Sequence, residues 1–282
     1  MTTDLAGKNI LITGANTGIG RATALALGKR GARLWLACRS EERTKPVLEE
    51  LSALGADARF MALDLGNLDS VRTSAKTFLA EDEPLHVLLN NAGLAGKRGQ
   101  TSDGFELTFG VNHLGHYLFT EWLLDRIKET GTARIVNVAS KAHYKATGVD
   151  FGALRQETAT TTGLPEYQVS KLCNVLHAKT LASRLEGTDV TTYSLHPGVI
   201  ASDVWRNVPW PIRPLMTMFM KSNEEGAATS IHCAVSDRAA SETGLYYDEC
   251  KVVEPSAPAL DAALADKLEA QSLEWVADYL PA

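Results

Sequence analysis

Short apolar segments that favour β-strands alternate with helical segments from the start of this chain to well beyond its middle. The strand-like segments, rich in Ile, Leu and Val, are 9–13, 33–37, 58–63, 85–89, 134–138 and 190–195. Helical segments follow them at 19–29, 41–54, 68–80, 105–128, 167–185 and 224–235. Strands and helices in this order form right-handed βαβ units, so the pattern predicts an α/β fold built on a parallel sheet.

The length of 282 residues by itself allows one or two domains. No linker rich in Pro, Gly or Ser interrupts the alternation, and several strand segments are apolar on both faces, as a sheet between two helix layers requires. We therefore predict a single doubly wound domain over residues 1–282, with about seven parallel strands and helices on both faces. Residues 257–280 are predicted to form a C-terminal helix that docks through Leu264, Leu268, Leu273 and Val276.

The composition narrows the classes of protein to which this chain can belong. Its 28 Lys and Arg residues against 34 Asp and Glu residues give a net charge of −6, which argues against nonspecific nucleic-acid binding. Cys38, Cys173, Cys233 and Cys250 show no paired spacing, so neither a disulfide framework nor a zinc site is expected. The first residues lack a signal-peptide pattern, and no apolar run reaches the roughly 18–20 residues of a membrane span. We expect a cytoplasmic protein without a membrane span.

A glycine-rich turn, Thr13–Gly20, lies between the first strand segment and the first helical segment. Its glycines at positions 14, 18 and 20 allow the backbone to turn sharply and approach a pyrophosphate, whose charge a helix N-terminus would meet. A glycine-rich turn can also bind nothing, but the flanking strand and helix supply the context of a dinucleotide site. The sequence therefore predicts that these residues bind a cofactor: Gly14, Asn16, Thr17, Gly18, Ile19 and Gly20.

Further motifs follow this turn in order, over about the first two hundred residues. They are Asp64-Leu65, Asn90–Gly93, Asn112, Ser140, Tyr167–Lys171 and Pro197-Gly198. Together with the GxxxGxG spacing of the turn, they resemble the short-chain dehydrogenase/reductase family, which implies a Rossmann-type fold and a nicotinamide cofactor. The resemblance implies that Asp64 contacts the adenine and that residues 90–93 line the adenosine ribose. The further cofactor-binding residues that it implies are Asp64, Leu65, Asn91, Ala92, Gly93, Pro197, Gly198 and Val199.

The end of the second strand segment bears on the choice between NAD and NADP. An acidic residue near this point would hold the ribose 2′-hydroxyl of NAD, but Cys38 takes that place and Arg39 follows. Because a guanidinium can bind a 2′-phosphate through two hydrogen bonds, Arg39 favours NADP(H). In the alternative, Arg39 is a solvated loop residue and Glu41 or Glu42 holds the ribose.

Tyr167 and Lys171 are four residues apart on a predicted helix, so their side chains lie on one face. A free tyrosine has a pKa of about 10, and a neighbouring ammonium lowers that pKa toward the range useful for proton transfer. Without the other motifs, this would be an ordinary surface pair, and Ser140 would be a helix cap or turn residue. The resemblance implies instead that Tyr167 transfers the proton and Ser140 binds the substrate oxygen. It also implies that Lys171 holds the nicotinamide ribose and that Asn112 anchors a water in a proton relay.

Three local motifs narrow the resemblance to the retinol dehydrogenase branch of the family. They are 112–117, 170–174 and 196–198, and the gap between Ser140 and Tyr167 is also longer than the usual dozen or so residues. This branch implies NADP(H) and substrates that are apolar aldehydes, ketones or alcohols. His143 and Tyr144 follow Ser140, and we expect them to border the substrate.

The segment 199–222 interrupts the alternation with three prolines and several Trp, Met and Phe residues. It lies where the family places its substrate-binding loop, so it is predicted to form an adaptable apolar lid over a bulky substrate. In the alternative, the segment is an apolar patch for contact with another subunit or with a membrane.

These expectations combine into NADP(H)-dependent interconversion of a small apolar aldehyde or ketone and its alcohol, with Tyr167 as acid and base. The alternatives are an NAD-linked alcohol or steroid dehydrogenase and a noncatalytic cofactor-binding sensor or scaffold. The resemblance also implies a homodimer or homotetramer, formed through the helices that contain Asn112 and Tyr167. No metal is expected, because no carboxylate or cysteine joins His113 and His116, which are three residues apart.

Overall fold

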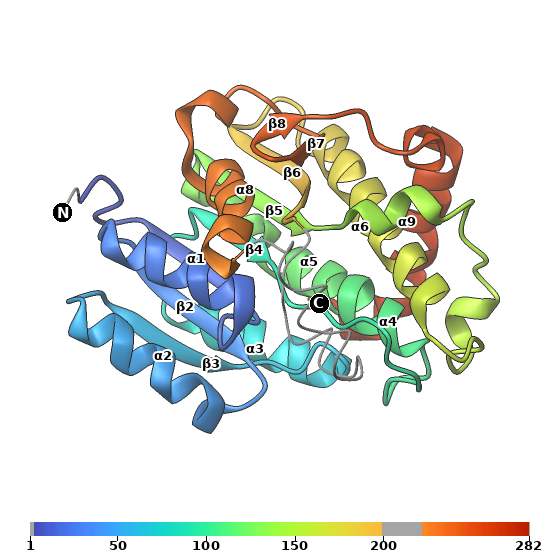
Figure 1. Cartoon of the computed structure of the whole chain (residues 1–282), viewed down its shortest axis with the longest axis horizontal. Coiled ribbons are helices and arrows are strands. Elements are labelled where there is room, and N and C mark those ends of the chain that lie inside the picture. The colour runs from blue at the N-terminus through green and yellow to red at the C-terminus, as the bar shows by residue number, and fades with distance from the viewer. Residues whose placement is uncertain (1–2, 199–221, 282) are drawn as a thin grey trace.

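The computed structural model describes residues 3–198 and 222–281, in which eight strands form one sheet in the order β3-β2-β1-β4-β5-β6-β7-β8 (Figure 1). The strands are β1 (Asn9–Thr13), β2 (Arg33–Cys38), β3 (Ala58–Ala62), β4 (Val87–Asn90), β5 (Ala133–Val138), β6 (Val190–His196), β7 (Leu245–Asp248) and β8 (Lys251–Val252). Neighbouring strands are parallel except for β7 and β8, which are antiparallel. The predicted doubly wound α/β domain is confirmed: β1 to β7 are parallel, as expected of about seven strands, and the two-residue β8 adds an antiparallel edge that was not predicted.

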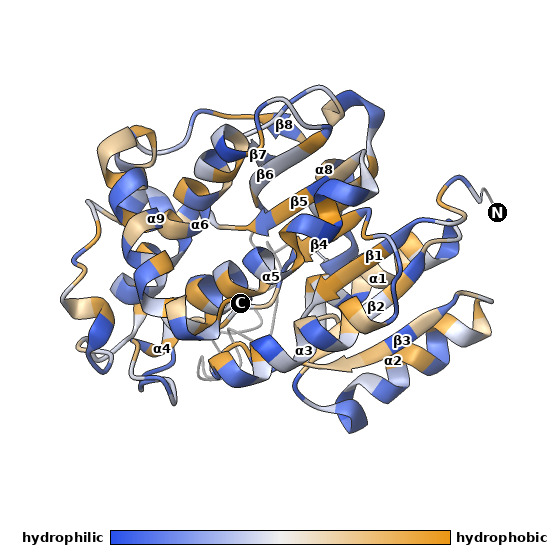
Figure 2. Ribbon diagram, turned by 180° about the vertical axis from the view of Figure 1, so that it is seen from behind, coloured by the Kyte–Doolittle hydropathy of each residue, from blue (hydrophilic) through white to orange (hydrophobic). Residues whose placement is uncertain are grey.

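Helices cover both faces of this sheet. They are α1 (Gly18–Lys29), α2 (Glu41–Ala53), α3 (Leu68–Ala80), α4 (Leu107–Phe109), α5 (Gly115–Thr130), α6 (Leu164–Arg184), α8 (Asn223–Val235) and α9 (Ala262–Val276). The helices α1, α2 and α8 cover one face, and α3, α5 and α6 cover the other (Figures 1 and 2). Alternation along β1 explains the two layers, because Ile10 and Ile12 pack toward the first group and Leu11 toward the second.

The strands β7 and β8 do not emerge from the sequence pattern. β7 has four residues and β8 has two, which is too short for a period of two to be recognised. In the structure, Tyr246 and Tyr247 of β7 are both buried, on opposite faces of the sheet. β7 therefore contributes two large aromatic side chains to the core, one to each helix layer.

The C-terminal region folds as α9 flanked by short 3-10 turns at 257–260 and 277–279. Leu268 and Val276 are buried and Leu264 packs against the core, as expected, but Leu273 is 45% exposed and its predicted docking is wrong. Leu273 follows Leu268 by five residues, which turns it about 140° away around the helix. Trp275 fills the contact instead, against the rings of Phe105 and Phe109.

The predicted lid, 199–222, lies outside the described residues except for Ser222. The Ser222 hydroxyl accepts a hydrogen bond from the backbone N–H of Glu225, whose carboxylate accepts one from the Ser222 N–H, so Ser222 caps α8. The lid itself stays a prediction. Over residues 3–198 and 222–281, none of the helices combines the length and apolar character needed to cross a membrane.

Candidate active site

The candidate site lies where the order of the strands reverses, between β1 and β4. From this point the chain continues outward to β2 on one side and to β5 on the other, so the loops after β1 and β4 diverge at the carboxyl edge of the sheet. Thr13, the last residue of β1, joins the two loops. Its hydroxyl accepts hydrogen bonds from the backbone N–H groups of Asn91 and Ala92, each at 2.9 Å.

The glycine-rich turn after β1 has the geometry that a phosphate cradle requires. Gly14 and Gly18 have positive φ angles of 68° and 56°. A Cβ atom on Gly20 would lie 2.4 Å from the carbonyl oxygen of Gly14, and one on Gly14 would lie 2.9 Å from Ala92. The helix α1 begins at Gly18 with no side-chain cap and no acidic residue in its first turn. Its first N–H groups and the positive end of its dipole therefore suit a pyrophosphate.

We expect Gly20→Ala to weaken dinucleotide binding at least about tenfold, because the new Cβ atom would force Gly14 and the turn to move. Fluorescence titration with NADPH measures the affinity. Gly148→Ala is the control, since a Cβ atom there would meet nothing within 4 Å. An unchanged affinity of Gly20→Ala would show that the turn does not hold the cofactor.

The other predicted cofactor residues of the first half lie along the same edge. The exposed Asp64 accepts a hydrogen bond from the Gly66 N–H at 3.0 Å, and Leu65 beside it is buried. The amide of Asn91 donates to the carbonyl of Thr13 at 2.8 Å, which holds the loop after β4 close to the turn. A Cβ atom on Gly93 would lie 3.2 Å from Asn112 Oδ1 and 3.5 Å from Lys171 Nζ. This loop thus links the cofactor side of the site to the predicted catalytic residues.

Asn112 lies in a π-helical turn, Gly110–Leu114, that interrupts the predicted helix over 105–128. The Asn112 Oδ1 atom accepts a hydrogen bond from the Leu94 N–H at 2.8 Å. Its Nδ2 atom donates to the Leu94 carbonyl and to Ser170 Oγ, both at 3.0 Å. The side-chain amide therefore connects the loop after β4 to α6, and the relay water expected at Asn112 stays a prediction.

Ser140, Tyr167 and Lys171 meet at the carboxyl end of β5. Ser140 lies two residues after the end of β5, and its side chain is hydrogen-bonded to Tyr167, the fourth residue of α6. Lys171 lies one turn further along α6, with Nζ 5.7 Å from the centre of the Tyr167 ring and 2.8 Å from the Val138 carbonyl to which it donates. The structure thus brings together the side chains that the motifs predict to be catalytic.

The environment changes the proton affinities of both ionisable groups. Burial raises the pKa of Tyr167, and the hydrogen bond with Ser140 lowers it. Burial lowers the pKa of Lys171 to about 7, and no carboxylate of the described residues forms an ion pair with this lysine. A lysine with a pKa near neutrality can bind and release a proton during a reaction at neutral pH.

A family model described as short chain dehydrogenase matches residues 8–154 of this chain. The chain belongs to the short-chain dehydrogenase family. Human retinol dehydrogenase 11 is 42% identical over 273 residues, covering 95% of this chain and 85% of that protein. Human retinol dehydrogenase 13 is 38% identical over 281 residues, covering 96% of this chain and 85% of that protein. A solved structure of an uncharacterized protein from Mycobacterium paratuberculosis has 28% identity and a TM-score of 0.79, with 100% of this chain and 99% of that chain covered.

These relatives confirm the predicted resemblance to the retinol dehydrogenase branch of the short-chain dehydrogenase family. They also place the chain among oxidoreductases that act on alcohol and carbonyl groups and use a nicotinamide cofactor.

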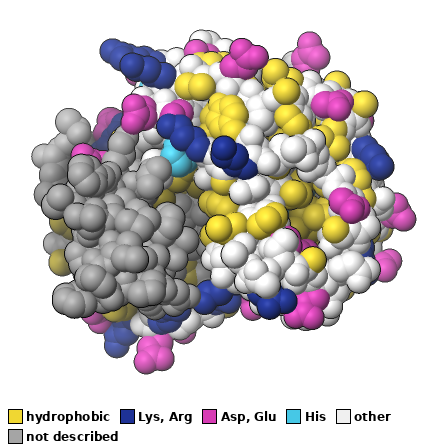
Figure 3. All heavy atoms as spheres, turned by 45° about the vertical axis from the view of Figure 1, so that its right-hand side comes forward, with side chains coloured by type: hydrophobic (Ala, Val, Ile, Leu, Met, Phe, Trp, Pro, Cys, Tyr) yellow, Lys and Arg dark blue, Asp and Glu magenta, His cyan; other side chains and the backbone are white. Residues whose placement is uncertain are grey.

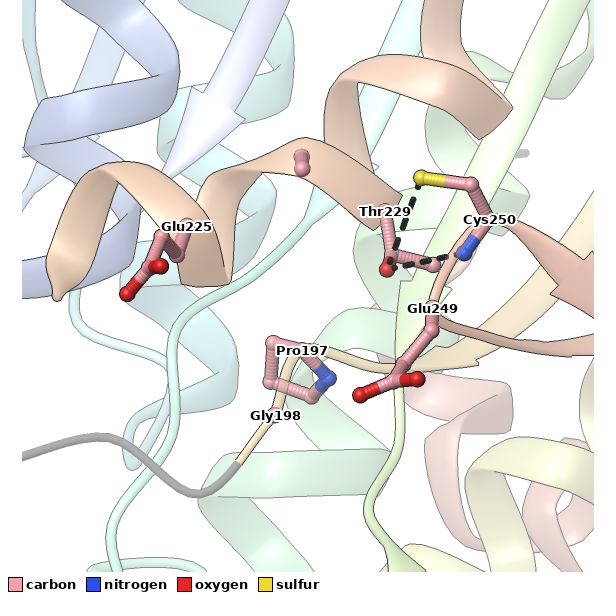
Figure 4. A pocket seen from close by; sticks show the side chains of 7 residues that line it. Pro197, Gly198, Glu225, Thr229, Glu249 and Cys250 are labelled. Carbon is pink, nitrogen blue, oxygen red and sulfur yellow. Dashed lines mark hydrogen bonds between the residues drawn. The ribbon is translucent and has the colours of Figure 1, made fainter. Parts of the chain in front are cut away.

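A cavity of about 270 Å³ lies beside Pro197 and Gly198, two of the predicted cofactor residues of this short-chain dehydrogenase. Among the described residues it is lined by Pro197, Gly198, Glu225, Ala228, Thr229, Glu249 and Cys250 (Figure 4). The Thr229 hydroxyl accepts a hydrogen bond from the Cys250 N–H at 3.3 Å, and Figure 4 shows the Glu249 side chain extending toward Pro197. Two carboxylates in the lining disfavour a phosphate here, so the phosphates of a dinucleotide are better placed at the glycine turn. Val199 lies outside the described residues.

The structure corrects the expectation that His143 borders the substrate. Its side chain is fully buried, and both ring nitrogens are in use. The Ser256 N–H donates to Nε2 at 3.1 Å, so Nδ1 carries the proton and donates to the Ser140 carbonyl at 2.7 Å. His143 therefore supports the loop that carries Ser140. Tyr144 is exposed, and its hydroxyl donates to the carbonyl of Glu254.

Several supporting residues could not be assigned a role from their sequence positions. Ser170 and Asn174 lie on the same face of α6 as Lys171, and Asn174 donates to the Val138 carbonyl at 3.2 Å, beside the lysine. The i, i+4 spacing of these two polar residues on the predicted helix 167–185 was a usable signal. Within 3–198 and 222–281, histidine, cysteine, aspartate and glutamate side chains form no cluster of three or more suited to a metal ion.

Proposed function

We propose that this short-chain dehydrogenase uses NADP(H) to interconvert an apolar aldehyde or ketone and its alcohol. The observation that carries the proposal is the meeting of Ser140, Tyr167 and Lys171 beside the glycine turn. The nicotinamide, when bound, supplies or accepts the hydride. In the direction of reduction, Ser140 donates a hydrogen bond to the carbonyl oxygen and Tyr167 gives it a proton. The Lys171 ammonium stabilises the phenolate that remains.

Three features near the end of β2 support NADP(H) as the cofactor. Arg39 is exposed, and within the described residues its guanidinium makes no hydrogen bond or ion pair, so it is available to a 2′-phosphate. Cys38, in the position of the acid that would bind the 2′-hydroxyl of NAD, is buried and cannot accept such a bond strongly. Glu41 and Glu42 lie in the first turn of α2, where their charges stabilise the helix N-terminus.

We expect Arg39→Asp to lower the preference for NADPH over NADH at least about tenfold, because it removes the cation and adds a carboxylate that repels a 2′-phosphate. The ratio of kcat/KM for the two cofactors measures the preference. Arg238→Asp makes the same change of charge at an exposed arginine of the 3-10 turn 237–239, which follows α8. It should leave the ratio unchanged. An unchanged ratio in Arg39→Asp would count against the 2′-phosphate contact.

The substrate class rests on the relatives and on apolar surface near the site. The relatives named above are retinol dehydrogenases, and retinol and its aldehyde are apolar. Tyr144 and Leu164, near the two ends of the long segment between Ser140 and Tyr167, are exposed apolar side chains. Figure 3 shows hydrophobic side chains among the polar ones on one face of the molecule. These observations favour a substrate with a large hydrocarbon part.

A homo-oligomer and a cytoplasmic location complete the proposal, and α9 constrains the oligomer. The helix α9 lies against α5 and α6 of the same chain (Figure 1). Glu269 of α9 accepts a hydrogen bond from the Tyr117 hydroxyl of α5 at 3.1 Å and forms an ion pair with Arg184 of α6. Oligomerisation directly through these two helices would have to displace α9. A dimer or tetramer of this protein is therefore proposed to use other surfaces.

The decisive experiment follows NADPH and NADH consumption over a panel of retinoid, aliphatic, aromatic and steroid carbonyls. We expect an apolar aldehyde or ketone to be reduced with NADPH, and NADH to be used at least about tenfold less efficiently. More efficient use of NADH than of NADPH with an aliphatic or steroid carbonyl would support the first alternative, because the reverse of that reaction is NAD-linked oxidation of the alcohol. Tight binding of NADPH without turnover of any substrate would support a sensor or scaffold.

A further inference from the structure

His116, on the first turn of α5, lies between the cofactor turn and the π turn that holds Asn112. Its side chain is 2% exposed. The Nε2 atom is 2.8 Å from Thr13 Oγ1, and the Nδ1 atom is 3.0 Å from the main-chain oxygen of Asn112. One buried imidazole thus bridges the end of β1 and the π turn, which are about a hundred residues apart in the chain.

The hydrogen bonds of Thr13 determine which nitrogen of His116 carries the proton. A hydroxyl has two lone pairs and one proton, and the Thr13 oxygen already accepts from the N–H groups of Asn91 and Ala92. Its proton must therefore be donated, and His116 Nε2 at 2.8 Å is much closer than the Leu89 carbonyl at 3.5 Å. Nε2 is the acceptor, so Nδ1 carries the proton and donates to the Asn112 carbonyl.

The charge state of His116 agrees with this arrangement. Burial lowers the pKa of His116 to about 3, although the bond to Asn112 acts in the opposite direction, and the nearby Lys171 and His113 lower it further. A proton on Nε2 would point at a Thr13 oxygen whose lone pairs are both occupied. The ring is therefore neutral at the pH values at which the enzyme would work.

We propose that His116, as the Nδ1–H tautomer, is a positioning residue that holds the π turn against the ends of β1 and β4. The inference rests on the proposed function. The main chain of Asn112 is held by His116, and the side chain of Asn112 holds Leu94 and Ser170. Ser170 Oγ in turn donates to the main-chain oxygen of Tyr167 at 2.8 Å. The bridge therefore sets the position of the Tyr167 turn of α6 relative to the cofactor turn.

The kinetic test compares His116→Phe with the same substitution at another buried histidine. Phenylalanine keeps the ring and removes both hydrogen bonds, so we expect kcat to fall about tenfold to a hundredfold. NADPH affinity should change less than about threefold, because Thr13 keeps its bonds to the loop after β4. His177→Phe is the control, since His177 is equally buried and its ring nitrogens have no hydrogen-bond partner among the described residues. A kcat of His116→Phe equal to that of the control would overturn the proposal.

A second pair of variants separates positioning from a general loss of structure. Thr13→Ser keeps the hydroxyl and should keep most of kcat. Thr13→Val removes the bridge together with the bonds from Asn91 and Ala92, and should lower kcat at least as much as His116→Phe does. The double variant Thr13→Val with His116→Phe should lose little more than the worse single variant, because both changes break one bridge. Fully additive losses would show that the two residues act independently, which contradicts the proposal.

A measurement without turnover distinguishes failure of this inference from failure of the proposed function. Nitrogen NMR of protein labelled at its histidines should show one ring, absent in His116→Phe, that is protonated at Nδ1 and unchanged from about pH 8 to about pH 5.5. An Nε2–H tautomer, or titration near the ordinary histidine pKa, would overturn the inference whatever the activity. If no carbonyl is turned over, the proposed function fails and this spectrum alone decides whether the bridge exists.

Discussion

Tyr167→Phe is expected to lower turnover about a thousandfold, while NADPH affinity stays within about threefold of the wild type. The substitution removes the hydroxyl that is hydrogen-bonded to Ser140 and leaves the ring, which has Lys171 Nζ 5.7 Å from its centre. The proton of the reaction then has no donor or acceptor at this position. Steady-state kinetics with the best carbonyl of the panel, together with NADPH titration, measures both effects.

Tyr279→Phe is the matched control for this substitution. The Tyr279 hydroxyl donates to Asp103 Oδ1 at 3.2 Å, in the 3-10 turn 277–279 that follows α9. Its loss should change turnover less than about threefold. Retention of more than about a tenth of the wild-type turnover by Tyr167→Phe would remove the tyrosine from the proposed mechanism.

Lys171→Met is expected to abolish turnover and, at the same time, to stabilise the fold near neutral pH. Burial lowers the pKa of Lys171 from 10.5 to about 7, so folding is opposed by the cost of burying the ammonium. Between about pH 7 and pH 10.5, the lysine is protonated in the unfolded chain and mostly neutral in the folded protein. Wild-type stability therefore rises as pH increases from about 7 to 10.5, and the full penalty applies below about 7.

Methionine fills a similar volume without a charge, so the variant should be more stable at pH 7 by about 1 to 4 kcal/mol. The free energy of unfolding of Lys171→Met should also lack the increase between about pH 7 and pH 10.5 that Lys171 causes in the wild type. The Val138 carbonyl, which loses the lysine as a donor, keeps its bond from Asn174 at 3.2 Å. Denaturant unfolding at several pH values measures the change.

Lys179→Met, two turns along α6 at a half-buried lysine, is the control and should change stability by less than about 0.5 kcal/mol. If Lys171→Met is destabilised at pH 7, the buried ammonium does not carry the expected cost. If it turns over substrate as well as the wild type, the lysine has no part in the mechanism.

Local patterns predicted much of the fold because the signals that start and end each element are themselves local. α3 occupies the predicted residues, Leu68–Ala80, since the Asn67 side chain accepts from the Ser70 N–H and caps a helix with an apolar stripe. β1 likewise matches its prediction. In contrast, Leu273 repeats an apolar pattern but faces solvent, because the packing of α9 on α6 decides which side of α9 is buried.

The same division holds for the candidate site. The glycine turn and the Tyr167–Lys171 spacing are short motifs whose geometry follows from one turn or one helix, so the sequence by itself determined them and the family. Only the tertiary structure decided that His116 reaches Thr13 and that His143 joins Ser140 to Ser256. Those contacts join segments about a hundred residues apart, and they exist because the sheet places the ends of β1, β4 and β5 side by side. A local pattern contains no information on such neighbours, since burial and hydrogen-bond partners depend on how the whole chain closes around its sheet.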